Sequence, residues 1–160
     1  MTTPGGGMGS KWINNGSLYI GGNNTQAGGT GTVNISENGL VNVTGTTKQW
    51  ARGTVNLDGG ILSTDTLDLT AGGTFNMLDG LLRAKKIDGD INYQTGTISP
   101  GRSLGILTVT GDYTQGAAAT LEIELGGDSS IVRSTPCASL PQIAVPRAIE
   151  RLQTVCPTHT

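Results

Sequence analysis

Apolar and polar residues alternate along much of the chain, in short stretches separated by glycine-rich turns. The stretch GTVNI at residues 31–35 returns as GTVNL at 53–57 and as GTFNM at 73–77, at separations of 22 and 20 residues. A period of two is that of a β-strand, in which successive side chains point to opposite faces. The three stretches therefore predict three equivalent strands, with apolar residues on one face and Thr and Asn on the other.

Each copy is followed by a short turn and then by a second apolar run. A unit of about 20 residues with two or three strands cannot bury its apolar face alone, whereas stacked units form a continuous core. The turns are Glu37-Asn38-Gly39, Asp58-Gly59-Gly60 and Asp79-Gly80, and the apolar pairs after them are Leu40-Val41, Ile61-Leu62 and Leu81-Leu82.

We therefore predict an all-β chain that folds as a right-handed parallel β-solenoid of about five or six coils. The repeats are expected over residues 16–127, after a lead-in at 1–15 and before a tail at 128–160. An antiparallel β-sandwich is the alternative, because closely spaced glycine-rich turns also suit that fold. Stacking predicts one outward row of Thr32, Thr54 and Thr74, and a hydrogen-bonded row of Asn34, Asn56 and Asn76.

Composition agrees with a β-fold and excludes several classes of protein. The 160 residues include 26 glycines, and charged residues make up 14% with a net charge of -2. A nucleic-acid-binding protein would carry a basic patch, which this balance excludes. No apolar run is long enough to span a membrane as a helix. The opening MTTPGGGMGS lacks the features of a secretory signal, so we expect a removed leader or a longer parent chain.

The tail at 128–160 differs from the repeats, because it contains four of the six prolines and no glycine. Residues 146–156 predict a short helix that begins with a proline and has an apolar face. Such a helix is a candidate cap for the open strand edge of a solenoid. The alternative is that the tail is foreign to the repeat. Cys137 and Cys156 fit either a disulfide or two free thiols.

The segment SPGRSLGILTVTGDYTQGAAATLEIELGG at residues 99–127 follows the repeats. Together with them it resembles the passenger repeats of autotransporter-type proteins and the ectodomains of PEP-CTERM-type exported proteins of bacteria. The resemblance covers about residues 16–127. It implies a β-solenoid located outside the cell or on the bacterial cell surface, and it implies no particular activity.

Residues 101–105 match G-x-S-x-G, the pattern around the nucleophilic serine of many esterases. Ser103, then Asp112 or Asp128, then His159 follow in the order of a catalytic triad. The esterase pattern requires a helix directly after the turn, whereas here the alternation predicts a strand. His159 also lies next to the end of the chain. We therefore expect Ser103 to occupy a structural corner, with the triad as a less favoured alternative.

The carboxylates at the turns are the second candidate site. Glu37, Asp58 and Asp79 are predicted to occupy one corner of consecutive coils and to stack about 5 Å apart. Oxygen ligands suit Ca²⁺, which would also offset repulsion between stacked carboxylates. Asp-Gly is equally ordinary turn chemistry, which favours a purely structural role. The candidate metal ligands are Glu37, Asp58, Asp65, Asp68, Asp79, Asp88 and Asp90.

These features predict an extracellular structural or adhesive β-solenoid domain of a bacterial surface or secreted protein, stabilised by calcium. The expected partners are surface glycans, matrix or further copies bound through the solenoid ends. The alternative is a Ca²⁺-dependent hydrolase of glycan, ester or lactone bonds, in which Asp58 and Asp79 beside the metal activate water. The sequence favours a protein that is not an enzyme.

Overall fold

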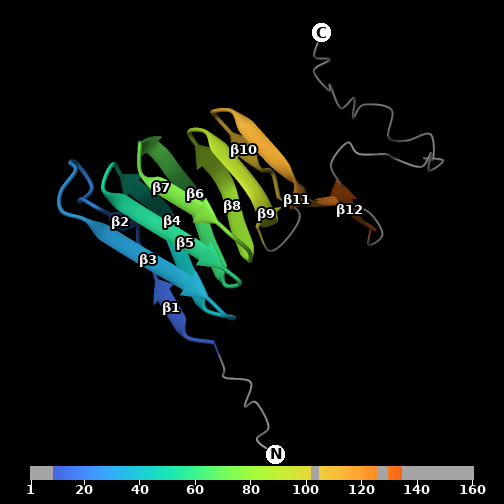
Figure 1. Ribbon diagram of the computed structural model, residues 1–160, viewed down its shortest axis with the longest axis horizontal. Coiled ribbons are helices and arrows are strands. Elements are labelled where there is room, and N and C mark those ends of the chain that lie inside the picture. The colour runs from blue at the N-terminus through green and yellow to red at the C-terminus, as the bar shows by residue number, and fades with distance from the viewer. Residues whose placement is uncertain (1–8, 102–104, 126–129, 135–160) are drawn as a thin grey trace, which may run out of the picture.

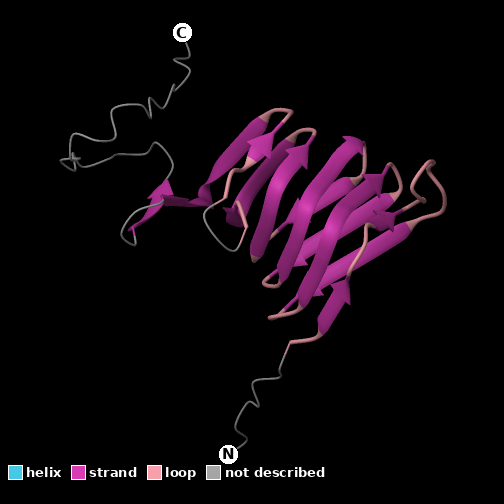
Figure 2. Ribbon diagram, turned by 180° about the vertical axis from the view of Figure 1, so that it is seen from behind, coloured by secondary structure: helices cyan, strands magenta, loops and turns pink. Residues whose placement is uncertain are grey.

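A computed structural model describes residues 9–101, 105–125 and 130–134 (Figure 1). These residues form strands joined by turns, and no helix is present among them (Figure 2). The strands are β1 (Lys11–Asn14), β2 (Leu18–Ile20), β3 (Gly31–Ser36), β4 (Leu40–Trp50), β5 (Gly53–Asp58), β6 (Ile61–Ala71), β7 (Thr74–Met77), β8 (Leu81–Asp88), β9 (Ile91–Ser99), β10 (Thr108–Val109), β11 (Tyr113–Leu125) and β12 (Ser130–Ser134).

Successive coils of the chain pair through parallel strands. One sheet has the order β3-β5-β7, and a nine-stranded sheet follows β1-β4-β6-β8-β9-β11-β12, with β2 and β10 attached to β4 and β8. The predicted parallel β-solenoid is confirmed, and the antiparallel sandwich is wrong. The solenoid has about four turns, not five or six. The first described coil is incomplete, because β1 and β2 pair with β4 whereas no described strand lies before β3 in the β3-β5-β7 sheet.

The repeats stack residue on residue. Thr54 pairs with both Thr32 and Thr74, which confirms the predicted threonine row, and the neighbouring positions keep the same register. In β4 and β6 the register shifts after Val43, and this bulge bends the long strands around the core. The coils lie side by side along the length of the molecule (Figure 1).

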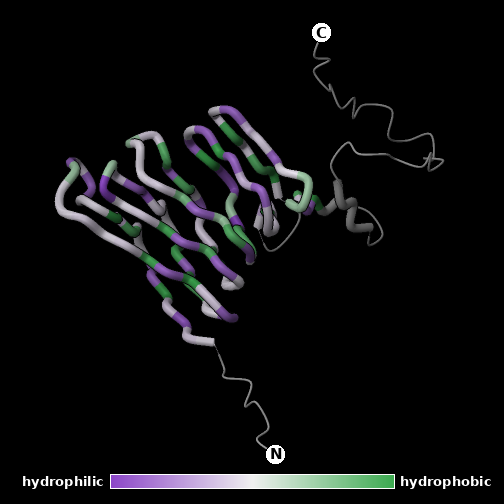
Figure 3. The backbone as a smooth tube through the Cα atoms, in the orientation of Figure 1, coloured by the Kyte–Doolittle hydropathy of each residue, from purple (hydrophilic) through white to green (hydrophobic). Residues whose placement is uncertain are grey.

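Apolar residues recur along the coils, and Figure 3 shows them as green segments between purple and white ones. The buried ones among them form the core. Val55, Leu57, Leu62, Leu67 and Leu82 are all at most 1% exposed. Each of these residues is in register with a residue of the coil before and of the coil after it, so the core continues along the axis.

Glycine forms the corners of the middle coils. Gly59 and Gly80 have φ values of 84° and 98°, a region that suits glycine. At Gly80 a Cβ atom would also lie 2.4 Å from the carbonyl oxygen of Gly60. The first corner differs, because Glu37 and Asn38 take positive φ values of 41° and 64° without being glycine.

Beyond the last coil, β12 pairs antiparallel with residues 121–125 of β11. The predicted boundary at residue 127 falls in the connection between these two strands. The predicted helix at 146–156 and both cysteines lie outside the described residues.

Candidate functional site

The three corner carboxylates lie in successive turns but do not form the expected stack. Asp58 is in register with Ser36, so Glu37 lies one residue further along its turn than Asp58 does. Asp79 is two residues after Met77, whose partner Leu57 directly precedes Asp58. The stacking prediction is therefore corrected. Glu37 and Asp79 each follow the last inward residue of their strand by two positions, whereas Asp58, in the coil between them, follows it by one.

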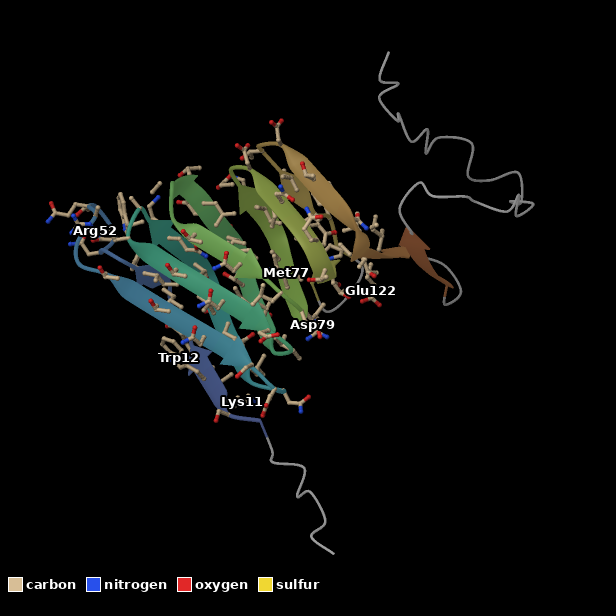
Figure 4. All side chains as sticks on the ribbon, in the orientation of Figure 1. Lys11, Trp12, Arg52, Met77, Asp79 and Glu122 are labelled. Carbon is tan, nitrogen blue, oxygen red and sulfur yellow. The ribbon has the colours of Figure 1, made fainter. Side chains whose placement is uncertain are left out.

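Each of the three side chains points into solvent. Figure 4 shows Asp79 at the edge of the solenoid, where its Oδ1 accepts a hydrogen bond of 2.7 Å from the backbone N–H of Gly80. Such a bond within one turn stabilises the corner. Among residues 9–101, 105–125 and 130–134, no three His, Cys, Asp or Glu side chains gather so that they could hold a metal ion.

The other predicted ligands lie apart and have partners of their own. Asp65 pairs with Lys85 at 2.7 Å, and Asp88 pairs with Lys86 at 2.8 Å. Asp90 accepts a hydrogen bond of 2.9 Å from the backbone N–H of Asp112. The contacts of Asp65 and Asp90 join one coil to the next, whereas the Asp88–Lys86 pair joins two residues of β8.

Asp68 is held most firmly of these carboxylates. Lys48, one coil earlier and in register, donates to its Oδ2 at 2.6 Å, and Thr70 donates to its Oδ1 through both N–H and hydroxyl. The Lys48 Nζ also lies 4.8 Å from the centre of the Trp50 ring. Burial alone would raise the pKa of Asp68, but the hydrogen bonds from Lys48 and Thr70 outweigh it and hold the pKa below its usual value.

The predicted asparagine row is confirmed as a hydrogen-bonded ladder. Asn56 Nδ2 donates to Asn34 Oδ1 at 2.7 Å, and Asn76 Nδ2 donates to Asn56 Oδ1 at 2.8 Å. Every amide in the ladder donates toward the N-terminal end of the solenoid. The ladder is therefore directional, and its first member, Asn34, has its Oδ1 engaged by Asn56.

The sequence analysis missed a pair of tyrosines at the other end of the solenoid. The hydroxyl groups of Tyr93 and Tyr113 are hydrogen-bonded, and their rings meet edge to face with centroids 5.7 Å apart. Burial raises the pKa of both phenols. The alternation that places Ile91 inward also places Tyr93 inward, so the pattern contained this signal. Next to the pair is an apolar cavity of about 330 Å³, lined by Pro100, Gly105, Leu107, Val109, Tyr113, Leu121 and Ile123.

A larger groove, of about 630 Å³, opens at the N-terminal end of the solenoid. Its walls are the edge of β3 and the beginning of β1. Figure 4 shows Lys11 and Trp12 at this end of the molecule. The lining residues include Lys11, Trp12, Val33, Asn34, Ile35 and Glu37.

The predicted triad falls mostly outside the described residues. Ser103, Asp128 and His159 are not among them, so the triad stays a prediction. Asp112 is exposed, and its backbone N–H is bonded to Asp90.

Searches against protein-family models, curated proteins and solved structures give no match for this chain. In the described part of the chain, no helix could cross a membrane. Function is therefore inferred from the arrangement of this chain's own residues.

Proposed function

We propose that this chain is a structural scaffold domain of an extracellular or cell-surface bacterial protein. The observation that carries the proposal is the pairing of outward polar side chains between coils. The Asn34-Asn56-Asn76 ladder and the Lys48–Asp68 ion pair both join equivalent positions of neighbouring coils. Polar groups used in this way stabilise the stack.

The location outside the cell is supported by the resemblance of residues 99–127, and of the repeats before them, to exported bacterial proteins. A solenoid built of repeated coils extends by adding coils, which suits a spacer or stalk between other domains. Glycans, matrix or further copies of the chain are the partners that fit such a role.

Calcium and hydrolysis stay predictions from the acidic turns, and one experiment separates them from the scaffold role. Thermal unfolding is measured with EDTA and with added Ca²⁺, alongside turnover of model esters, lactones and polysaccharides. The scaffold proposal expects no turnover under either condition. A fall in melting temperature with EDTA that Ca²⁺ reverses, still without turnover, adds a structural calcium site to the scaffold role.

Turnover that EDTA abolishes and Ca²⁺ restores would contradict the scaffold proposal. Its loss in Asp58→Ala or Asp79→Ala, with the fold retained, would assign it to the corner carboxylates. Asp65→Ala is the matched control, because Asp65 is an exposed carboxylate paired with Lys85 and away from that corner.

A further inference from the structure

The chain contains four copies of the pattern Asn-x-Ser/Thr with a middle residue other than proline. This pattern is the acceptor of N-linked glycosylation, in which a sugar is attached to the side-chain amide of the asparagine. Because the pattern is short, the surroundings of each asparagine decide whether it is a good acceptor. The four copies are Asn15-Gly16-Ser17, Asn23-Asn24-Thr25, Asn34-Ile35-Ser36 and Asn42-Val43-Thr44.

Asn23 lies at the tip of the connection from β2 to β3, which projects beyond the strands that it joins (Figure 1). Its backbone N–H donates to the carbonyl oxygen of Gln26 at 3.0 Å, which closes the tip as a tight turn. The indole Nε1 of Trp50 donates to the carbonyl oxygen of Asn23 at 2.8 Å and ties the turn to β4. Residues 23–30 are all exposed, so the loop presents Asn23 to solvent in a defined conformation.

Three donors converge on the side-chain oxygen of Asn23. The backbone N–H groups of Thr25 and Gln26 donate to its Oδ1 at 2.8 and 3.0 Å, and the Thr25 hydroxyl donates to it at 3.0 Å. Donors on an amide oxygen stabilise the negative charge that develops there when Nδ2 loses a proton. Nδ2 is the atom that takes the sugar, and it makes no hydrogen bond within the described part of the chain.

Two of the other copies lie in strands, where this arrangement is absent. Asn34 and Ser36 belong to β3, and Asn42 and Thr44 belong to β4. In an extended strand, residues two apart are separated by about 7 Å, which keeps the hydroxyl away from the amide. The Oδ1 of Asn34 accepts its hydrogen bond from Asn56 of the next coil instead.

The remaining copy begins at Asn15, between β1 and β2. Its hydroxyl is directed elsewhere, because the Oγ of Ser17 accepts a hydrogen bond of 3.2 Å from the backbone N–H of Thr46 in β4. Among the four copies, Asn23 is therefore the one whose amide oxygen is bonded to the hydroxyl of its own pattern.

We propose that Asn23 is an acceptor site for N-linked glycosylation, with a sugar diphosphate ester as the donor. Nδ2 attacks the anomeric carbon of the sugar, and a carbon–nitrogen bond forms. The bond from that carbon to the diphosphate oxygen breaks, the diphosphate carrier leaves with the electron pair, and Nδ2 gives one proton to a base of the transferase. This site does not depend on the scaffold role.

The test offers the folded full chain two donors that share this chemistry. One reaction contains a soluble N-glycosyltransferase and UDP-glucose, and the other contains an oligosaccharyltransferase and a polyprenyl-diphosphate oligosaccharide. Mass spectrometry of proteolytic peptides measures the rate at each asparagine. We expect Asn23 to be modified at least about tenfold faster than Asn15, Asn34 and Asn42 with one donor or both, which also identifies the carrier.

Asn23→Gln and Asn24→Gln form a matched pair, because both asparagines are exposed in the same loop and only the first begins the pattern. Asn23→Gln is expected to abolish modification of the loop, and Asn24→Gln to leave it unchanged. At the hydroxyl position, Thr25→Val should abolish modification and Thr25→Ser should retain it, because only serine keeps the donor to Oδ1. Thermal unfolding of each variant verifies that the solenoid is intact.

Three outcomes overturn the proposal. The first is an Asn23 that takes no sugar from either donor. The second is equal rates at all four asparagines of the folded chain, which would mean that the loop contributes nothing. The third is modification of Asn23 that persists in Thr25→Val. The scaffold role stands in each case, because it is tested by metal dependence and turnover.

Discussion

The middle coils and the N-terminal end of this solenoid contain nearly the same residues in different surroundings. β3 and β5 share the pattern GTVN and pair in register, yet Val55 is 1% exposed and Val33 is half-buried. A strand of the middle has a neighbour on both sides, whereas β3 has one neighbour, β5, in the part of the chain that the structure describes. Burial in a stacked repeat therefore depends on the neighbouring coils as much as on the residue itself.

The largest expected difference concerns core residues. Leu62→Ala should lower the free energy of unfolding by about 2–5 kcal/mol, because Leu62 is 1% exposed and lies between two coils. Trp12→Ala, at the equivalent position of the incomplete coil, should cost less than half of that loss despite its larger side chain. Urea unfolding of the two variants measures both values, and equal losses would mean that the end is as well packed as the middle.

The asparagine ladder gives the next largest difference. Asn56→Ala removes two side-chain hydrogen bonds and should cost about 1–2 kcal/mol, whereas Asn34→Ala removes one and should cost about half as much. Urea unfolding under the same conditions gives the ratio. Equal losses of unfolding free energy in the two variants would mean that the contributions of the two hydrogen bonds are not additive.

The ion pair between coils makes the middle sensitive to acid. The pKa of Asp68 is lowered from 3.8 in the folded state, so its contribution is fully present above that value and is lost as the pH falls through the lower folded pKa. Asp68→Asn should remove about 0.2–1 kcal/mol at neutral pH, and this difference should shrink as the pH falls below 3.8. Unfolding free energies of both proteins from neutral pH to about pH 2 measure this; a constant difference across that range would contradict it.

A substitution at the first corner is expected to have the smallest effect, and to increase the free energy of unfolding. Glu37 has a φ of 41°, whereas Gly59 and Gly80 form the corners of the next two coils. Glu37→Gly should therefore stabilise the protein by about 0.5 kcal/mol, because relief of the left-handed conformation exceeds the added entropy of the unfolded chain. Thermal unfolding at two pH values separates this gain from the loss of the carboxylate charge, and destabilisation at both would show that the corner is not strained.

The sequence predicted the stack and the ladder because identical residues recur at fixed separations. It did not predict the positions of the corner carboxylates, since these depend on where each turn places its acidic residue. It also missed Gln49, which is fully buried and whose side-chain amide has no hydrogen-bond partner among the described residues. The groove could not be predicted either, because it depends on which of the described strands lacks a neighbour.

The central claim is that coils stack in parallel register and that, among residues 9–101, 105–125 and 130–134, β3 has a neighbouring strand on one side only. Amide hydrogen exchange, resolved by residue in the dilute protein, tests both parts directly. We expect slow exchange at every amide of β5, and in β3 slow exchange at Val33 and Ile35 with fast exchange at Asn34 and Ser36. Uniform protection along β3, or alternating protection along β5, would contradict this account of the fold.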